Sequence, residues 1–137
     1  MLVKIIESYG TKRPKELGEI HRRLAKAYLA EGDNQKAMEE LDRAFRIEPG
    51  NVSVLTLLGQ VAMDLGDYKK AQQMFRALLL QKLDETGPVK KSEVFLRLGE
   101  IHEKIGEAPK AIQMYERAIQ TDGLEAAKER LAALKGK

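Results

Sequence analysis

The chain has 137 residues, 43% hydrophobic and 33% charged, with a formal net charge of +3, which suits one folded domain or a short array of repeats and argues against disorder. It contains no Cys, which excludes disulfides, thiolate metal sites and a cysteine nucleophile. No apolar run approaches the roughly 20 residues of a membrane span, and the basic residues are too dispersed for a nucleic-acid surface, so we expect neither membrane insertion nor nucleic-acid binding.

Residues 1–17 precede the part of the chain that repeats. Within them, Leu2, Ile5, Ile6 and Tyr9 recur at helical spacing and predict a short helix, followed by a linker, that covers the first repeat. The same residues could equally be the remnant of a preceding repeat in a longer chain. The segment has no basic lead-in and no small-residue cleavage site, so it does not resemble a secretory signal. We therefore expect a cytoplasmic protein, or a periplasmic one if a signal has been removed.

A pattern of small and apolar residues recurs three times in the central part of the chain. Gly32 and Gly66 lie 34 residues apart, and Gly106 follows 40 residues later, which is the same period plus a six-residue insertion. Each Gly has a Leu and then a small residue upstream, and an Ala and then a large residue downstream. These positions are Leu24, Leu58 and Leu98; Ala25, Gly59 and Gly99; Ala37, Ala71 and Ala111; and Leu41, Phe75 and Tyr115. The period indicates three stacked repeats, at residues 18–51, 52–85 and 92–125.

Each repeat is predicted to be a pair of antiparallel helices. Apolar residues recur at helical spacing on both sides of each Gly, and a Gly just past a helix end adopts the left-handed conformation that ends the helix. Asp33 and Asp67 suit the cap of the following helix, whereas Glu107 is a poorer cap and Pro109 fits a first helical turn. The recurring Ala and Gly positions mark where the two helices approach closely.

The insertion occupies residues 86–91. Helix propensity continues through residues 78–85 before it, so we expect the second helix of repeat two to be lengthened. Pro14 and Pro88 each lie four residues before a repeat, and we expect the first helices of repeats one and three to begin early at these prolines. Residues 124–137 predict a C-terminal capping helix. Its apolar side would consist of Leu124, Leu131 and Leu134.

At these positions the chain resembles the tetratricopeptide repeat family, whose 34-residue repeats carry a large–Leu–Gly–Tyr pattern and then Ala, an aromatic residue, Ala and Pro. The resemblance covers about residues 18–125. It implies an all-α fold, a right-handed superhelical array of antiparallel helix pairs known as an α-solenoid. The sequence departs from the family at His21, Leu55 and Phe95, where the family often has Trp, and its closing Pro occurs only as Pro49.

No residue pattern indicates catalysis or a cofactor. His21 and His102 are the only histidines, and both fall on large-residue positions of the helical core, so we expect them to be structural. A metal site would need a second ligand at helical spacing, and Glu103, next to His102, faces elsewhere. No glycine-rich phosphate loop is present. We therefore expect no enzyme, and no catalytic, metal-binding or cofactor-binding residue.

The resemblance implies a groove that the first helices line and that holds a segment of another protein. By the family's geometry, the candidate groove residues are Arg22, Lys26, Leu29, Thr56, Leu57, Gln60, Met63, Arg97, Glu100 and Lys104. Arg22, Lys26 and Arg97 would meet acidic groups, while Leu57 and Met63 would hold an apolar side chain. The alternative is a solvated helix face whose charges serve solubility.

We therefore predict a non-catalytic protein–protein interaction module that binds a peptide or a helical segment of a partner, with acidic groups in that segment. The alternative is a structural segment of a longer repeat scaffold, or a solenoid that self-associates through its ends. Some family members clamp the carboxylates of chaperone tails. The positions that correspond to that clamp are Arg22, Lys26, Leu57, Glu93 and Arg97. Because Leu57 and Glu93 do not match it, we expect no clamp of this type.

Overall fold

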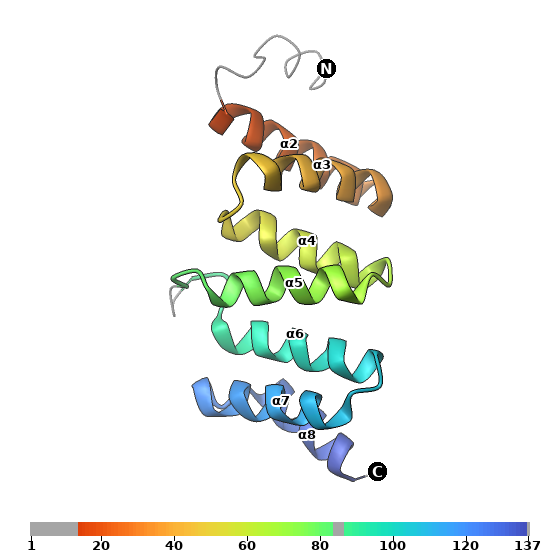
Figure 1. The fold of residues 1–137 in the computed structure, drawn as a ribbon, viewed down its shortest axis with the longest axis vertical. Helices are drawn as coiled ribbons and strands as arrows, with labels where there is room; N and C mark the ends of the chain where they lie inside the picture. The colour runs from red at the N-terminus through yellow and green to blue at the C-terminus, as the bar shows by residue number, and fades with distance from the viewer. Residues whose placement is uncertain (1–13, 84–86, 137) are drawn as a thin grey trace. The chain divides into compact units, whose positions relative to one another are not determined.

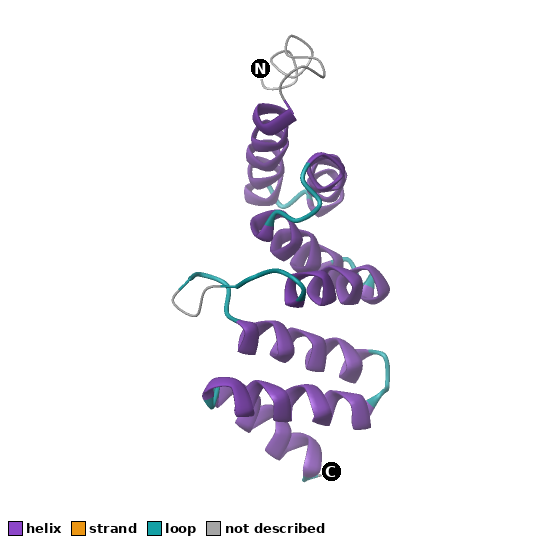
Figure 2. Cartoon of the chain, turned by 60° about the vertical axis from the view of Figure 1, so that its left-hand side comes forward, coloured by secondary structure: helices purple, strands orange, loops and turns teal. Residues whose placement is uncertain are grey.

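The computed structural model describes residues 14–83 and 87–136, and in these residues it contains seven helices and no strand (Figure 1). The helices are α2 (Pro14–Ala30), α3 (Asn34–Ile47), α4 (Val52–Asp64), α5 (Tyr68–Leu79), α6 (Lys91–Lys104), α7 (Ala108–Asp122) and α8 (Glu125–Lys135). Figure 2 shows loops as the connections between them. The predicted all-α class is confirmed, whereas the helix predicted within residues 1–17 lies almost entirely outside the described residues.

The chain forms two compact units, and the boundary between them follows Asp67. Helices α2, α3 and α4 belong to the first unit, and helices α5 to α8 belong to the second. In the first unit α3 packs against both α2 and α4; in the second, α6 packs against α5 and α7, and α8 packs against α7. Among the described residues, no helix is both long and apolar enough to cross a membrane.

Helices α2, α4 and α6 end in the same kind of turn. The turn glycines have φ angles of 80° to 82°, and they are Gly32, Gly66 and Gly106. In each turn the residue after the Gly donates its backbone N–H to a carbonyl five residues back, as Asp33 does to Tyr28 at 2.9 Å. This bond satisfies a carbonyl that the helix end would leave unpaired. A Cβ atom on any of the three glycines would meet nothing within 4 Å, so the left-handed backbone, rather than crowding, is what requires Gly there.

The α2–α3 hairpin packs through small side chains. Ala25 on α2 and Ala37 on α3 are fully buried, which lets the helix backbones approach, and Leu41, one turn further along α3, is fully buried as well. Asp33 caps α3, because its Oδ1 accepts a hydrogen bond from the backbone N–H of Lys36 at 3.1 Å. The small-residue positions and this cap were both predicted from the sequence.

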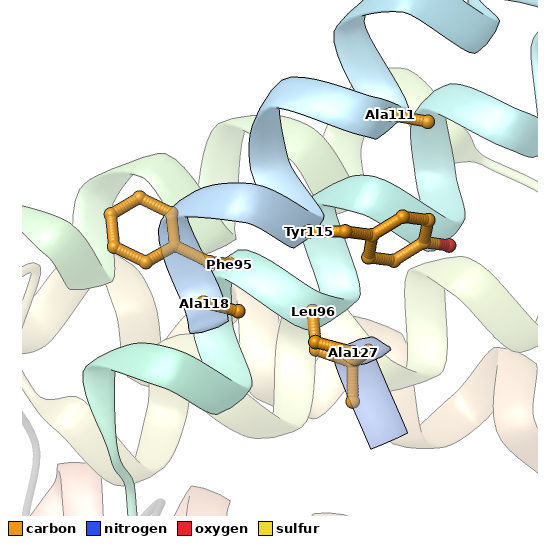
Figure 3. Close-up of a cluster of buried hydrophobic side chains, with 6 residues drawn as sticks. All are labelled: Phe95, Leu96, Ala111, Tyr115, Ala118 and Ala127. Atoms are coloured by element: carbon orange, nitrogen blue, oxygen red, sulfur yellow. The ribbon is translucent and has the colours of Figure 1, made fainter. Parts of the chain in front are cut away.

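Compared with the α2–α3 hairpin, the α6–α7 hairpin has a smaller residue, Gly99, on its first helix and a larger one, Tyr115, on its second. A Cβ atom at Gly99 would overlap the ring of Tyr115, so this position admits only Gly while the Tyr ring stays where it is. Figure 3 shows the buried cluster around this ring, which consists of Phe95, Leu96, Ala111, Tyr115, Ala118 and Ala127. Leu124, Leu131 and Leu134, the apolar side predicted for residues 124–137, pack against the cluster.

Two helix boundaries differ from the prediction. Helix α2 begins at Pro14 as expected, but α6 begins at Lys91 and not at Pro88. Lys90 has an extended backbone (φ −102°, ψ 144°), so Pro88 cannot belong to the helix that starts after it. The predicted lengthening of α5 is also wrong, because the helix ends before Leu80. That side chain is 86% exposed, so extending the helix through it would not gain the burial that stabilises a helix in a protein.

Candidate functional site

The candidate groove residues lie on three helices, and the two compact units divide them. In the first unit they form the α2/α4 set, which consists of Arg22, Lys26, Leu29, Thr56, Leu57, Gln60 and Met63. In the second unit they form the α6 set, which consists of Arg97, Glu100 and Lys104. The surroundings of each set show which of these side chains already form ion pairs or hydrogen bonds within the chain.

Arg22 lies against the end of α3. Its Nη2 is 3.7 Å from Oε1 of Glu48, and both side chains are 26% exposed. Oε2 of Glu48 accepts a hydrogen bond from Asn51 at 3.3 Å, and its carboxylate is so close to Gly18 that a Cβ atom there would overlap it. Among the described residues, Nε of Arg22 and Oε1 of Glu48 are buried without a hydrogen-bond partner. An acidic group of a partner would therefore compete with Glu48 for Arg22.

The rest of the α2/α4 set offers one exposed charge and three half-buried apolar side chains. Lys26 is exposed, and it forms no ion pair within the described part of the chain. The apolar members are half-buried, and they are Leu29, Leu57 and Met63. Gln60 is exposed, whereas the hydroxyl of Thr56 donates to the backbone oxygen of Val52 at 2.8 Å. The side chains of this set that remain available to a partner are therefore Lys26, Gln60, Leu29, Leu57 and Met63.

Arg97 and Glu100 of the α6 set are already paired with each other. Nη1 of Arg97 donates to Oε1 of Glu100 at 2.7 Å, and Nη2 of Arg130 on α8 donates to Oε2 at 2.9 Å. Two guanidinium groups thus share one carboxylate that is 13% exposed, and this cluster carries one net positive charge. Lys104 is exposed. Sequence reasoning did not single out Arg130, because a partner 30 residues away leaves no local pattern.

Neighbouring positions on α6 are also engaged by α7 and α8. Leu96 is 8% exposed and belongs to the cluster of Figure 3, where it lies beside Ala127 of α8. The hydroxyl of Tyr115 donates to Oε1 of Glu103. Burial of the phenol and this hydrogen bond to Glu103 raise the pKa of Tyr115 well above its usual range, so the group remains a neutral donor. This face of α6 therefore helps to hold α7 and α8 in place.

A polar trio joins α2 to α3, and two of its three members are buried. His21 and Glu40 are 8% and 6% exposed, and Nδ1 of His21 lies 2.8 Å from Oε2 of Glu40. Nη1 of Arg43 donates to the other oxygen of Glu40 at 2.5 Å. The buried position of His21 agrees with the structural role predicted for it. The sequence did not single out Glu40, since nothing in its neighbourhood distinguishes it from the exposed Glu39 beside it.

His102 is buried on α6, with 3% of its surface exposed. Its Nδ1 has no hydrogen-bond partner within the described chain and is 3.9 Å from Oε2 of Glu107. Burial lowers the pKa of His102 below its usual value of about 6.5; Glu107 opposes this shift, and Arg76 and Lys110 add to it. The position fits the predicted structural role. In the segments that the structure describes, no group of three or more His, Asp or Glu side chains is arranged to hold a metal ion.

Two family models match the sequence, and both are described as Tetratricopeptide repeat. One matches residues 28–91, and the other matches residues 94–127. Together the two matches include the recurring positions from Gly32 to Tyr115. No curated protein matches the chain.

Solved structures with the same arrangement of helices include the crystal structure of MamA, which is 19% identical with a TM-score of 0.78 over 97% of this chain and 72% of that one. The N-terminal domain of stress-induced protein-1 from C. elegans is 15% identical with a TM-score of 0.76, over 92% and 99% of the two chains. The second TPR domain of human RPAP3, solved in complex with the HSP70 peptide SGPTIEEVD, is 20% identical with a TM-score of 0.74, over 90% and 99%. At these identities the likeness concerns the fold.

Proposed function

The chain belongs to the tetratricopeptide repeat family, and on this premise we propose that it is a non-catalytic protein-interaction module. Its first helices would bind a peptide or a helix of another protein. The observation that carries the proposal is the surface that the fold leaves unused on α2 and α4, where Lys26 is exposed and Leu57 and Met63 are half-buried. The RPAP3 domain is similar in fold and was solved with a bound peptide, which supports a peptide as the class of ligand.

The ligand that suits this surface combines an apolar side chain with an acidic group. Leu57 and Met63 would contact the apolar side chain, and the flexible thioether of Met63 can adapt to its shape. Lys26 would meet the acidic group, because no described residue neutralises its charge. Arg22 and Arg97 contribute less, since Glu48 and Glu100 lie against them within the chain.

The surface differs from one that clamps a chaperone tail of the kind bound to RPAP3. Leu57 and Glu93 stand at two of the clamp positions, and neither can donate a hydrogen bond from its side chain to a carboxylate. Two further clamp positions hold Arg22 and Arg97, which face carboxylates of this chain. We therefore expect the peptide SGPTIEEVD to bind no more tightly than a peptide of scrambled sequence.

A random peptide library displayed on phage supplies the probe for a test. The peptide selected most strongly is measured by calorimetry against the wild-type chain, Leu57→Asp, Lys26→Glu and the control Lys69→Glu, whose Lys is exposed on α5, a second helix. We expect each groove variant to weaken binding by about tenfold or more, which is about 1.4 kcal/mol, and the control to bind like the wild type. Equal affinity for all four chains, with helix content unchanged by circular dichroism, would contradict the proposal.

A second candidate function is assembly, either within a longer repeat scaffold or by self-association. One observation favours it, because Ile20 and Leu24 on α2 are only half-buried and Ala27 is exposed. Sedimentation equilibrium separates the two functions. Association that Leu24→Asp or deletion of residues 124–137 abolishes would support assembly, whereas a monomer at every concentration would exclude self-association of this chain.

A further inference from the structure

Helix α8 covers part of the α6 face that carries the candidate groove residues. Leu96 is the fifth residue of its repeat, as Arg22 and Thr56 are of theirs. Arg22 and Thr56 are half-buried, whereas Leu96 is 8% exposed and lies beside Ala127 of α8 (Figure 3). A partner that approaches this face of α6 therefore also meets side chains of α8.

The charged side chain that α8 brings to this face is Arg130. Its Nη2 donates to Oε2 of Glu100 at 2.9 Å, and Nη1 of Arg97 donates to Oε1 of the same carboxylate at 2.7 Å. At the position of Glu100, α2 has Lys26 and α4 has Gln60, and both of these side chains are exposed. The side chain of Glu100 is only 13% exposed. One covered carboxylate thus holds two guanidinium groups close together.

Both guanidinium groups keep donors that the chain does not use. The side chains of Arg97 and Arg130 are 43% and 52% exposed. A guanidinium group has five N–H donors, and in the described part of the chain each of these two groups donates to Glu100 and to no other group. Each can therefore form further hydrogen bonds to a carboxylate of a partner while its bond to Glu100 stays in place.

The charge of the cluster also suits one more carboxylate. Glu100 neutralises only one of the two guanidinium groups, so one positive charge remains. The charges of Glu103 and Lys104, which follow on α6, cancel each other in this sum. A carboxylate brings one negative charge, whereas a phosphate group brings nearly two. Because Glu100 already holds the guanidinium groups together, a ligand would not have to order them, which lowers the cost of binding.

We propose that Arg97 and Arg130 form a subsite that binds one carboxylate of the partner peptide, from an acidic side chain or from the C-terminus. This inference rests on the proposed function, because it extends the peptide-binding surface to the second compact unit. Arg97 was a candidate from the family's geometry, but Arg130 stands at none of the five positions of the chaperone-tail clamp. The subsite therefore depends on α8 as well as on a first helix.

The test asks whether Arg130 contacts a carboxylate of the ligand or only holds α8. The probe is the peptide selected from the phage library, synthesised in its parent form, with each acidic residue changed in turn to its amide, and with an amidated C-terminus. Calorimetry compares the wild-type chain, Arg97→Gln, Arg130→Gln and the control Arg117→Gln, whose Arg is exposed on α7. We expect the first two variants to bind the parent peptide about tenfold more weakly, and the control to bind it like the wild type.

The neutralised peptides give a double-mutant cycle, which separates a direct contact from damage to the fold. We expect one of them to bind the wild-type chain and Arg130→Gln equally, and its altered position names the source of the carboxylate. If Arg130→Gln weakened every peptide by the same factor, the role of Arg130 would be structural and the inference would be overturned. Unchanged affinity of Arg130→Gln for the parent peptide would overturn it as well.

The failure of this inference differs from that of the proposed function. Weaker binding by Leu57→Asp and Lys26→Glu, with normal binding by Arg97→Gln and Arg130→Gln, would overturn the subsite and support the α2/α4 surface. The reverse result would support the subsite and overturn the α2/α4 surface. A library that enriched no peptide would overturn both.

Discussion

The α2–α3 and α6–α7 hairpins share a helix–turn–helix plan but fill it with different side chains. At equivalent buried positions the first helix has Ala25 in one hairpin and Gly99 in the other, and the second helix has Leu41 in one and Tyr115 in the other. The smaller residue on one helix accompanies the larger residue on the other. Protein interiors are packed about as densely as organic crystals, so neither member of such a pair can change size alone.

The two hairpins also differ in their buried polar groups. The first contains the carboxylate of Glu40, which pairs with His21 and Arg43, whereas the second contains the neutral hydroxyl of Tyr115, which reaches Glu103. Burying charges costs free energy that only good pairing offsets, while a neutral hydroxyl needs a single acceptor. Two hairpins with the same plan can therefore place their polar groups at different positions and depend on quite different interactions.

The largest expected loss of stability comes from removing the Tyr115 ring that packs against Gly99. Tyr115→Ala removes a fully buried ring, and we expect the free energy of unfolding to fall by about 3–5 kcal/mol in urea titrations followed by circular dichroism. Tyr115→Phe keeps the ring and loses only the hydrogen bond to Glu103, which is worth about 1 kcal/mol. If the two variants were destabilised equally, the ring would not be what fills this hairpin.

A smaller effect is expected from the charge inside the first hairpin. Glu40→Gln keeps the shape of the side chain but removes the charge that His21 and Arg43 share, and we expect a loss of about 1.5–3 kcal/mol in the same titrations. Glu39→Gln is the matched control, since Glu39 is the exposed neighbour on α3, and it should change stability by less than about 0.5 kcal/mol. Similar losses of stability in the two variants would mean that the pairing of Glu40 with His21 and Arg43 does not stabilise the folded chain.

The smallest effect is expected from pH acting on His102 in the second hairpin. The pKa of His102 is lowered in the folded chain, so the unfolded chain binds the proton more readily, and the stability that the neutral ring provides is lost as the pH falls below about 6.5. We expect unfolding midpoints to fall between pH 7 and about pH 5 in the wild type, and to fall less in His102→Tyr, which has a ring that does not titrate in this range. If both chains had the same pH profile, titration of His102 would not be the cause of the loss of stability at low pH.

The sequence predicted the features that depend on local spacing. The turn glycines, the cap at Asp33 and the small residues at Ala25 and Gly99 follow from a helix period and from backbone preferences, both of which act within a few residues. The wrong length predicted for α5 has the same origin, because helix propensity is a local quantity, whereas a helix in a protein gains most of its stability from packing an apolar face.

The site was less predictable, because its contacts join residues far apart in the chain. Glu40 lies 19 residues from His21, and Arg130 lies 30 residues from Glu100, so no period in the sequence relates the partners. The family's geometry could name Arg97 as a candidate groove residue. Only the arrangement of α6 and α8 in space shows that the Glu100 carboxylate lies between Arg97 and a second guanidinium group.

The turns after α2, α4 and α6 also have a consequence for handedness. Gly32, Gly66 and Gly106 hold a backbone conformation that mirror-image amino acids prefer, and all three are exposed at the ends of their helices. A D-alanine at these positions would restrict the unfolded chain without opposing the folded one, which is worth about 0.4–1 kcal/mol for each residue by analogy with other entropy-reducing substitutions. In a chain of L-residues only Gly, which is achiral, can make the same turn three times at little cost.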